Sequence, residues 1–300
     1  MMPPHDQPRR VGCRLLLLVA LISGCNSGSR QLKDRAETDW RKGKYSEAIQ
    51  ANEELYRLEP RGRYAPGALL SIAEILYLNQ RQLKQAIEFY DKLTQEFPDS
   101  PETMKARKQL AGIYANEVVD LNQAILQYDK ILQARDLEDR PEILFLRADA
   151  YFKQGEYYRA LRELIHLEES GVSGHLADQV ELKIGNIYQV QKKFSESIAP
   201  FRKVIAASCP ECRRRAVLSL TETYENLLDI DKAIETIRLL DDTPENTQMI
   251  ESEVARLNRS RKAVETGAGL ELKYPRPAEP PAKTATRKKR AASPTKSAKK

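Results

Sequence analysis

The chain has 300 residues, with 49 Lys or Arg and 43 Asp or Glu, so its net charge is +6 and its pI is about 9.0. Hydrophobic residues make up 41%, which is enough to bury a core and excludes a wholly disordered chain. With only 13 Gly, the composition argues against Gly-rich β-sandwiches and Gly-looped nucleotide folds, and no apolar run reaches the ~18 residues of a membrane-spanning helix.

The charge is distributed unevenly along the chain. Residues 1–24 carry +2, residues 25–270 carry −4, and residues 271–300 carry +8 because ten Lys and Arg there face two Glu. An excess of Lys and Arg that is confined to the two ends of the chain indicates charged tails rather than a basic domain. The net charge alone would favour a nucleic-acid binder, but it describes the ends of the chain and not its body.

Residues 1–24 have the pattern of an export signal. Basic residues precede an eight-residue apolar run at 15–22, and small residues separate that run from Cys25. A short apolar run with basic flanking residues and a small-residue ending is typical of a secretory signal peptide and not of a membrane span. An ordinary signal peptide, with Cys25 present by accident, is the alternative.

The ending Ile22-Ser23-Gly24-Cys25 resembles the lipobox of bacterial lipoproteins. That resemblance implies cleavage before Cys25, attachment of lipid, including palmitate, to this residue, and a periplasmic location. Two or more acyl chains give a stable membrane anchor where one gives a marginal anchor. Asn26 stands where an Asp marks retention in the inner membrane of well-studied Gram-negative bacteria, so we expect the outer membrane.

A pattern with a period near 37 residues fills the body of the chain. Each unit has a small residue within an Ala-Ile-like string, and these positions are 38, 38, 36, 37 and 36 residues apart: Ala48, Ala86, Ala124, Ala160, Ser197 and Ala233. A tyrosine precedes the small residue by nine or ten positions in five units: Tyr77, Tyr114, Tyr151, Tyr188 and Tyr224. Small residues let two helices approach closely, and the tyrosines are expected to fill the groove beside them, so both sets are predicted to be core.

Helix boundaries are also marked in the sequence. Second helices are expected to end at Pro60, Pro98 and Pro244, since a proline cannot continue a helix. Ser100 is then expected to cap the next helix, with Pro101 at its first position and Glu102 near its positive end.

This pattern resembles the tetratricopeptide repeat (TPR), in which two antiparallel helices form each unit. The resemblance covers residues 32–244 and implies an all-α superhelical solenoid of about six repeats. A further amphipathic helix at 245–266 is expected to cap the array. A tether at 25–31 and a disordered tail at 267–300 complete the predicted organisation.

In TPR proteins the first helix of each repeat lines a surface that binds partner segments. Mapping by repeat position therefore predicts a partner groove from these residues: Lys105, Lys108, Asn116, Phe145, Asp149, Phe152, Asn186, Gln189, Glu222 and Glu225. The family's carboxylate clamp requires Lys and Asn at matching positions of adjacent repeats. That pattern occurs at most once here, so a ligand of that class is not expected, and solvated helix faces are the alternative.

No catalytic pattern is present in the sequence. There are three His, and none belongs to a metalloprotease motif, a phosphate loop or a G-x-S-x-G elbow. We therefore expect neither an enzyme nor a cofactor or metal site.

Cys209 and Cys212 form a C-x-x-C motif in the loop that leads into the sixth repeat. A zinc site needs two more ligands, and haem attachment needs a His where residue 213 is Arg. The motif therefore predicts a local disulfide in an oxidising compartment, with free thiols and a redox role as alternatives.

The end of the chain is Pro-rich and then Lys-rich, including the run Arg287, Lys288, Lys289 and Arg290. This composition is typical of an extended disordered arm. An exported chain would not meet DNA, so the expected counter-charges are lipopolysaccharide, peptidoglycan or an acidic protein. A solubilising spacer is the alternative.

The leader and the repeats together resemble envelope TPR lipoproteins. The similar groups are the TPR lipoprotein of the β-barrel assembly machinery, Tol-Pal-associated TPR proteins and pilotin-type lipoproteins. The resemblance implies a lipid-anchored scaffold that binds proteins during envelope assembly. The alternative is an envelope protein whose basic tail is the binding element.

Overall fold

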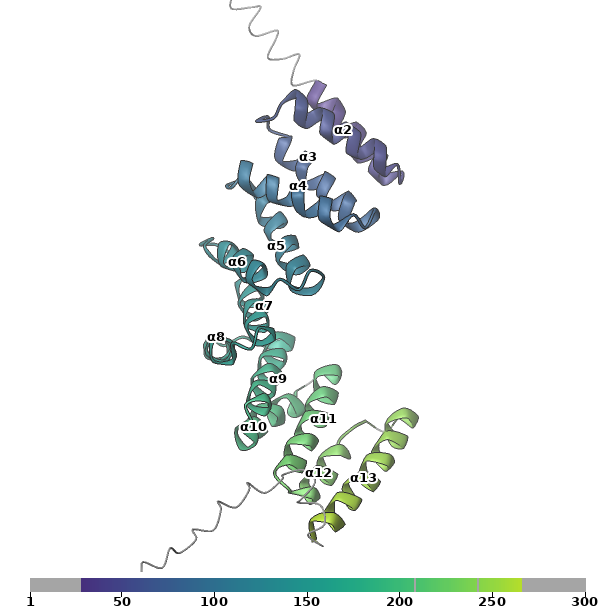
Figure 1. Cartoon of the computed structure of the whole chain (residues 1–300), viewed down its shortest axis with the longest axis vertical. Helices are drawn as coiled ribbons and strands as arrows, with labels where there is room; N and C mark the ends of the chain where they lie inside the picture. Colours follow the sequence, from purple (N-terminus) through teal and green to yellow (C-terminus); the bar gives the residue numbers. More distant parts are fainter. Residues whose placement is uncertain (1–27, 208, 242, 266–300) are drawn as a thin grey trace, which may run out of the picture. The chain divides into compact units, whose positions relative to one another are not determined.

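The computed structural model describes residues 28–207, 209–241 and 243–265, and within these ranges every regular element is a helix (Figure 1). A helix at 28–41 precedes the labelled elements. These are α2 (Tyr45–Leu58), α3 (Ala65–Glu74), η1 (Ile75–Asn79), α4 (Leu83–Glu96), α5 (Pro101–Asn116), α6 (Leu121–Leu132), α7 (Arg140–Lys153), α8 (Tyr157–Glu169), α9 (Gly174–Val190), α10 (Phe194–Ala206), α11 (Pro210–Asn226), α12 (Ile230–Ile237) and α13 (Pro244–Glu265). The predicted all-α repeat architecture is confirmed.

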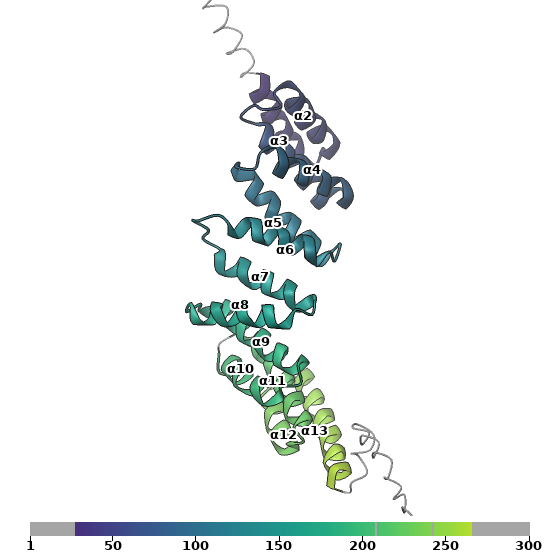
Figure 2. The same cartoon turned by 60° about the vertical axis from the view of Figure 1, so that its left-hand side comes forward.

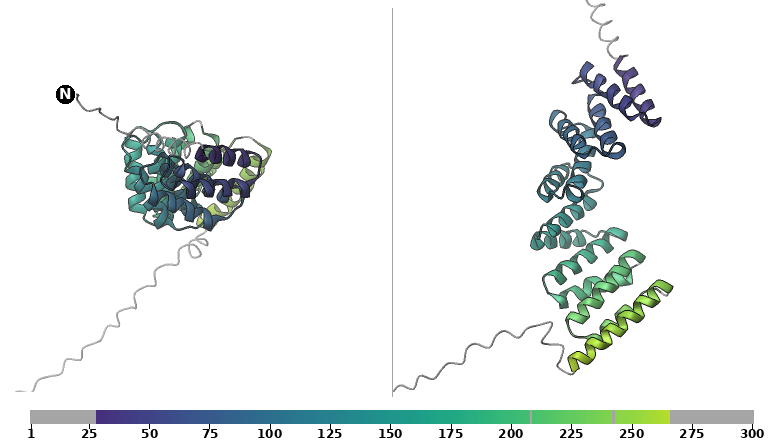
Figure 3. Two further views of the ribbon diagram at one scale, coloured as in Figure 1. Left: turned by 90° about the horizontal axis from the view of Figure 1, so that it is seen from above. Right: turned by 45° about the vertical axis from the view of Figure 1, so that its right-hand side comes forward.

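The chain divides into two compact units between Gln191 and Lys192. In the first unit the helices α2 to α9 follow one another in chain order, and each packs against the next (Figure 2). In the second unit α10 packs against α11, and α12 packs against both α11 and the long helix α13 (Figure 3). Contacts between neighbours along the chain are expected of a repeat array, where each repeat buries its apolar face against the next.

The small residues that set the period are core residues, as predicted. All six have no exposed surface: Ala48, Ala86, Ala124, Ala160, Ser197 and Ala233. Each lies near the start of a second helix, where a larger side chain would hold the paired helices apart.

The tyrosines are only partly core, which differs from the prediction. Tyr224 is 4% exposed, whereas Tyr77, Tyr114, Tyr151 and Tyr188 are half-buried and pack on the core from its edge. The reason is the phenol hydroxyl, which seeks a polar partner when its ring is buried. The Tyr77 hydroxyl, for example, donates a hydrogen bond to the Glu117 carboxylate.

The turn between the two helices of a repeat has the same backbone form throughout. One residue in each turn has positive φ: Gly43, Arg81, Val119, Gly155, Lys192 and Leu228. In three of these turns the residue after it donates its N–H to a carbonyl five positions back, as Glu156 does to Tyr151 at 2.9 Å, and after Arg81 the bond from Gln82 reaches six positions back to Leu76. This is a Schellman-type helix end, which satisfies carbonyls at the last turn of the helix. Only two of the six positions carry the Gly that this conformation favours.

Side-chain caps start several helices. The Ser100 hydroxyl accepts a hydrogen bond from the Thr103 N–H at 3.2 Å, with Pro101 in the first turn, which confirms the predicted cap. The carboxylates of Asp120 and Asp229 make the equivalent contact at the starts of α6 and α12. Each cap satisfies one backbone donor that the helix itself leaves unpaired.

Two predicted boundaries differ from those observed. The sequence predicts a tether at 25–31, but residues 28–31 already belong to the first helix. The last helix spans Pro244–Glu265, so Pro244 begins this helix and does not end α12. A proline fits the first turn because the N–H that it lacks would be unpaired there. Among the described helices, none combines the length and apolar character needed to cross a bilayer.

Candidate functional site

The first helices of the repeats form the surface on which the sequence predicts a partner groove. We call it the A-helix face, and in the first unit it comprises helix 28–41, α3, α5, α7 and α9. In the second unit it is contributed by α11.

A pocket of about 130 Å³ lies at the start of the A-helix face. Its walls are Trp40 and Lys33 of the first helix, Tyr64 and Gly67 at the start of α3, and Glu102 of α5. The buried residues Asn52 and Leu55 of α2 also line it. Pockets for drug-sized ligands occupy roughly 300–1,000 Å³, so this one has the size for one side chain of a peptide rather than for a cofactor.

The pocket combines an aromatic wall with paired charges. The Trp40 indole N–H donates to the Asn79 side-chain oxygen at 3.1 Å, which holds the ring in place. Lys33 and Glu37 form an ion pair at 2.6 Å, and the Arg63 guanidinium lies 5.7 Å from the centre of the Tyr64 ring. The hydrogen bond to Glu37 raises the pKa of Lys33. Apolar and aromatic side chains surrounded by both positively and negatively charged residues are typical of a protein-binding surface.

Several predicted groove residues meet in a polar network across α5, α7 and α9. The Asp149 carboxylate contacts Lys183 at 2.5 Å and Lys153 at 3.1 Å. Lys153 in turn donates to the Asn116 side-chain oxygen at 3.3 Å, and the Lys183 ammonium lies 4.8 Å from the centre of the Phe152 ring. The structure thus brings Asn116, Asp149 and Phe152 together, but the side-chain oxygens of Asn116 and Asp149 are already bound by the two lysines.

The charge state of Asp149 follows from this network. Burial raises the pKa of its carboxyl, but hydrogen bonds and ion pairs with Lys183 and Lys153 outweigh burial, so the pKa is lowered below its ordinary value. The carboxylate therefore stays charged and links α7 to α9 through Lys183, while Lys153 extends the network to Asn116 of α5. The network is better described as a link between repeats than as an open binding site.

The remaining predicted groove residues of the first unit are dispersed. Lys108 forms an ion pair with Asp139 at 2.6 Å, and Lys105 is exposed on the same helix. Phe145 is half-buried and packs against the core of the fourth and fifth repeats. Asn186 and Gln189 are half-buried on α9. These residues do not form a pocket with one another among the described cavities.

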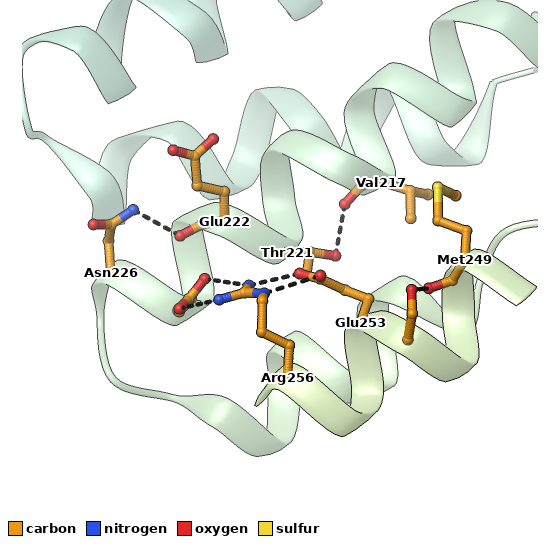
Figure 4. Close-up of polar contacts among 9 residues, drawn as sticks. Val217, Thr221, Glu222, Asn226, Met249, Glu253 and Arg256 are labelled. Atoms are coloured by element: carbon orange, nitrogen blue, oxygen red, sulfur yellow. Dashed lines mark hydrogen bonds and ion pairs between the residues drawn. The ribbon is translucent and has the colours of Figure 1, made fainter. Parts of the chain in front are cut away.

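The two acids predicted for α11 have different surroundings (Figure 4). Glu222 is exposed and points away from α13. Glu225 is only 9% exposed, and its two carboxylate oxygens accept hydrogen bonds from Arg256 of α13 at 2.8 and 2.7 Å. Arg256 also contacts Glu253, and the hydrogen bonds to both carboxylates raise the pKa of Arg256. Glu225 therefore holds the last helix against α11, with both carboxylate oxygens bound by Arg256, and its assignment to the groove stays a prediction.

Cys209 and Cys212 lie at the start of α11 without a bond between their sulfurs. Cys209 is half-buried and caps the helix, since its sulfur accepts a hydrogen bond from the Cys212 N–H at 3.2 Å. Cys212 is 3% exposed. The disulfide is thus not formed in this structure and stays a prediction for an oxidising compartment.

The predicted lipid site and basic tail lie outside the described residues. These are Cys25, with the leader 1–24, and the tail 267–300, which includes Arg287, Lys288, Lys289 and Arg290.

The pocket around Trp40 was not among the predicted site residues. The sequence offered one signal, because Trp40 is the chain's single Trp and stands in a first helix that departs from the repeat pattern. Its neighbours Tyr64 and Arg63 precede α3 in a loop, where the period gives no information about surface contacts.

Comparison with known proteins supports the repeat assignment. Residues 33–101 match the tetratricopeptide repeat family model. No curated protein matches the sequence.

Three solved structures share the fold at low sequence identity. A tetratricopeptide repeat protein from Parabacteroides merdae is 16% identical with a TM-score of 0.55, over 83% of this chain and 95% of that one. PilW, a type IV pilus biogenesis factor, is 14% identical with a TM-score of 0.50, over 74% and 98%. YrrB, a TPR protein with an unusual peptide-binding site, is 15% identical with a TM-score of 0.50, over 71% and 99%. The chain therefore has the tetratricopeptide repeat fold.

Proposed function

We propose that the chain is a non-catalytic scaffold that holds a segment of a partner protein on its A-helix face, with the Trp40 pocket as the anchor point. TPR arrays bind proteins and peptides through stacked repeats, so protein interaction is the function that the fold favours. The single observation that carries the choice of site is the pocket, which has room for one side chain and an aromatic wall held by Asn79. The well-paired Asp149 network is a weaker candidate because its charges are already satisfied.

The proposal includes a lipid anchor at Cys25 and a place at the periplasmic side of a Gram-negative outer membrane. The lipobox-like ending at 22–25 supports it. Envelope assembly is the context proposed, in the manner of barrel-assembly, Tol-Pal-associated or pilotin-type proteins, and PilW shares the fold. Palmitate labelling of the intact chain tests the anchor. We expect label on the wild type and none on Cys25→Ala, and label that persists in the variant would contradict the anchor.

Affinity purification from native cells tests the groove. One variant combines Trp40→Ala with Arg63→Glu, and a matched control places Glu88→Lys on the exposed surface of α4. We expect the partner proteins of the wild type to be retained by the control and lost from the pocket variant. Circular dichroism of both variants shows whether the helices are intact.

The second candidate is binding through the tail, which the +8 charge of residues 271–300 favours. Its ligand would be peptidoglycan, lipopolysaccharide or an acidic protein, and the attraction would weaken in salt. Deletion of residues 271–300 separates the two functions in the same purification. Partners that are lost with the tail and retained by the pocket variant would favour the second candidate over the first.

A further inference from the structure

The second unit contains a cysteine in a position that serine occupies in the first unit. Ser100 caps α5 and is followed by Pro101, whereas Cys209 caps α11 and is followed by Pro210. Both side chains accept a hydrogen bond from the N–H three residues on, at 3.2 Å. Sulfur is the weaker acceptor, so the cysteine is a poorer cap than the serine that the same turn accommodates. Helix capping alone therefore does not account for a cysteine at position 209.

The second cysteine is placed to react with the first. The two sulfurs lie within 4.8 Å of each other, and a disulfide requires about 2.05 Å, a change within reach of side-chain rotation at the helix start. Cys209 is half-buried, while Cys212 is 3% exposed. An external reagent can therefore approach Cys209, whereas burial shields Cys212 from solvent and leaves its sulfur within 4.8 Å of the Cys209 sulfur.

The surroundings favour attack by Cys209. Its sulfur lies at the N-terminal end of a 17-residue helix and accepts the Cys212 N–H at 3.2 Å. The thiolate is the form that attacks disulfides. A surface depression of about 310 Å³ lies next to the motif and is bordered by Pro210 and Glu211, although neither cysteine lines it.

We propose that Cys209 and Cys212 form a thiol–disulfide exchange site that takes an external disulfide as oxidant. The Cys209 thiolate attacks one sulfur of that disulfide, which forms a mixed disulfide and releases one thiolate. The Cys212 thiolate then attacks the Cys209 sulfur, which closes the Cys209–Cys212 bond and releases the second thiolate. The two cysteines lose two protons and two electrons, and the external disulfide is reduced to two thiols. A motif with two intervening residues closes a short loop, which removes little entropy from the unfolded chain, so the bond is reversible.

The proposal predicts different reactivities for the two sulfurs. The intact chain is incubated with oxidised glutathione, quenched with an alkylating reagent and mapped by peptide mass spectrometry, with Cys13 and Cys25 replaced by Ser in every sample. We expect the intact motif to form the Cys209–Cys212 disulfide and excess reduced glutathione to reopen it. Cys212→Ser should accumulate a glutathione adduct on Cys209. Cys209→Ser should acquire an adduct on Cys212 at least ten times more slowly.

Three results would overturn this proposal. One is the absence of the bond in the wild type under excess oxidised glutathione. Another is equal reactivity of Cys212 and Cys209 in the two variants, provided that circular dichroism shows both to be folded. The third is a bond that survives excess reduced glutathione in the folded chain, which would identify a permanent structural disulfide. None of these outcomes bears on the Trp40 pocket, so the proposed function is tested separately.

Discussion

Side chains about one repeat period apart in the sequence connect equivalent helices of neighbouring repeats. Trp40 bonds Asn79 across 39 residues, the Tyr56 hydroxyl donates to Glu96 across 40 at 2.5 Å, and Lys183 meets Asp149 across 34. In a repeat array each unit contacts only its neighbours, so bonds of this kind contribute directly to the coupling between units. They were not predictable from spacing, because a period identifies equivalent positions and not which side chains reach one another.

Replacement of Asp149 by Asn should reveal the strength of the network. The change leaves the ammonium groups of Lys183 and Lys153 without their carboxylate, and we expect the free energy of unfolding at pH 7 to fall by about 1–3 kcal/mol. Urea unfolding, monitored by circular dichroism, measures this change in the free energy of unfolding. The control Asp136→Asn removes an exposed acid and should change stability by less than ~0.5 kcal/mol.

The charge of Asp149 should also make the stability of the folded chain depend on pH. The pKa of Asp149 is lower in the folded chain than its ordinary value, so its contribution is fully present above the unfolded pKa of about 3.9 and is lost as pH falls through the folded pKa. The difference in stability between wild type and Asp149→Asn should therefore shrink between pH 5 and pH 3. A difference that stays constant over this interval would mean that Asp149 does not act through its charge.

The buried small positions should not tolerate larger side chains. Ala233 has no exposed surface, and Ala233→Leu adds three carbon atoms where α12 packs closely against α11. We expect a loss of about 1–3 kcal/mol or more, because overpacking forces side chains off their rotamers and shifts the backbone. Ala255→Leu, at an exposed position of α13 in the same unit, is the matched control and should unfold like the wild type. Equal unfolding of the two variants would show that this position tolerates bulk.

At the level of elements, the turns within repeats store conformational strain. Val119 has φ of 58° and is 66% exposed, and a β-branched residue in this region is unfavourable. The turn that ends α7 uses Gly155 at the equivalent position, with φ of 85° and open space where a Cβ atom would stand. The difference between these turns is therefore conformational and not a matter of packing.

Placing Gly at position 119 and Val at position 155 should change the stability of the chain in opposite directions. We expect Val119→Gly to raise the free energy of unfolding by about 1 kcal/mol and Gly155→Val to lower it by about 1–2 kcal/mol. Thermal and urea unfolding of both variants measure the effect. A loss of stability in Val119→Gly would indicate that the exposed valine makes a contact that outweighs its backbone strain.

The helices and their order could be predicted well from the sequence, and the side-chain contacts could not. The buried Ala-Ile strings and the Ser100-Pro101 cap follow from local rules on helix packing and capping. The contact of Glu225 with α13 could not be predicted, because its partner Arg256 lies in a helix outside the repeat pattern. The Trp40 pocket was missed for a similar reason, since Tyr64 and Arg63 lie in a loop.

At the scale of the whole chain, the positive charge and the proposed binding pocket lie at different places. The +8 segment 271–300 is at the end of the sequence, whereas the Trp40 pocket is lined by residues between Lys33 and Glu102, within a body of −4. Because the charges around the pocket are of both signs, groove binding should depend less on salt than binding through the tail, which should weaken as ionic strength rises. Partner recovery measured at ~50 mM and ~500 mM salt distinguishes the two, and recovery that collapses in high salt would contradict binding in the groove.

Site-specific photo-crosslinking in native cells tests the central proposal most directly. A photoreactive residue is placed at Lys33 or Ser71, which line the pocket, and at Glu47 or Glu88, which are exposed on second helices. We expect a protein adduct of one defined mass from the two pocket positions, lost on Trp40→Ala, and none from the two control positions. Adducts that form equally from all four positions, or from the second helices alone, would contradict partner binding on the A-helix face.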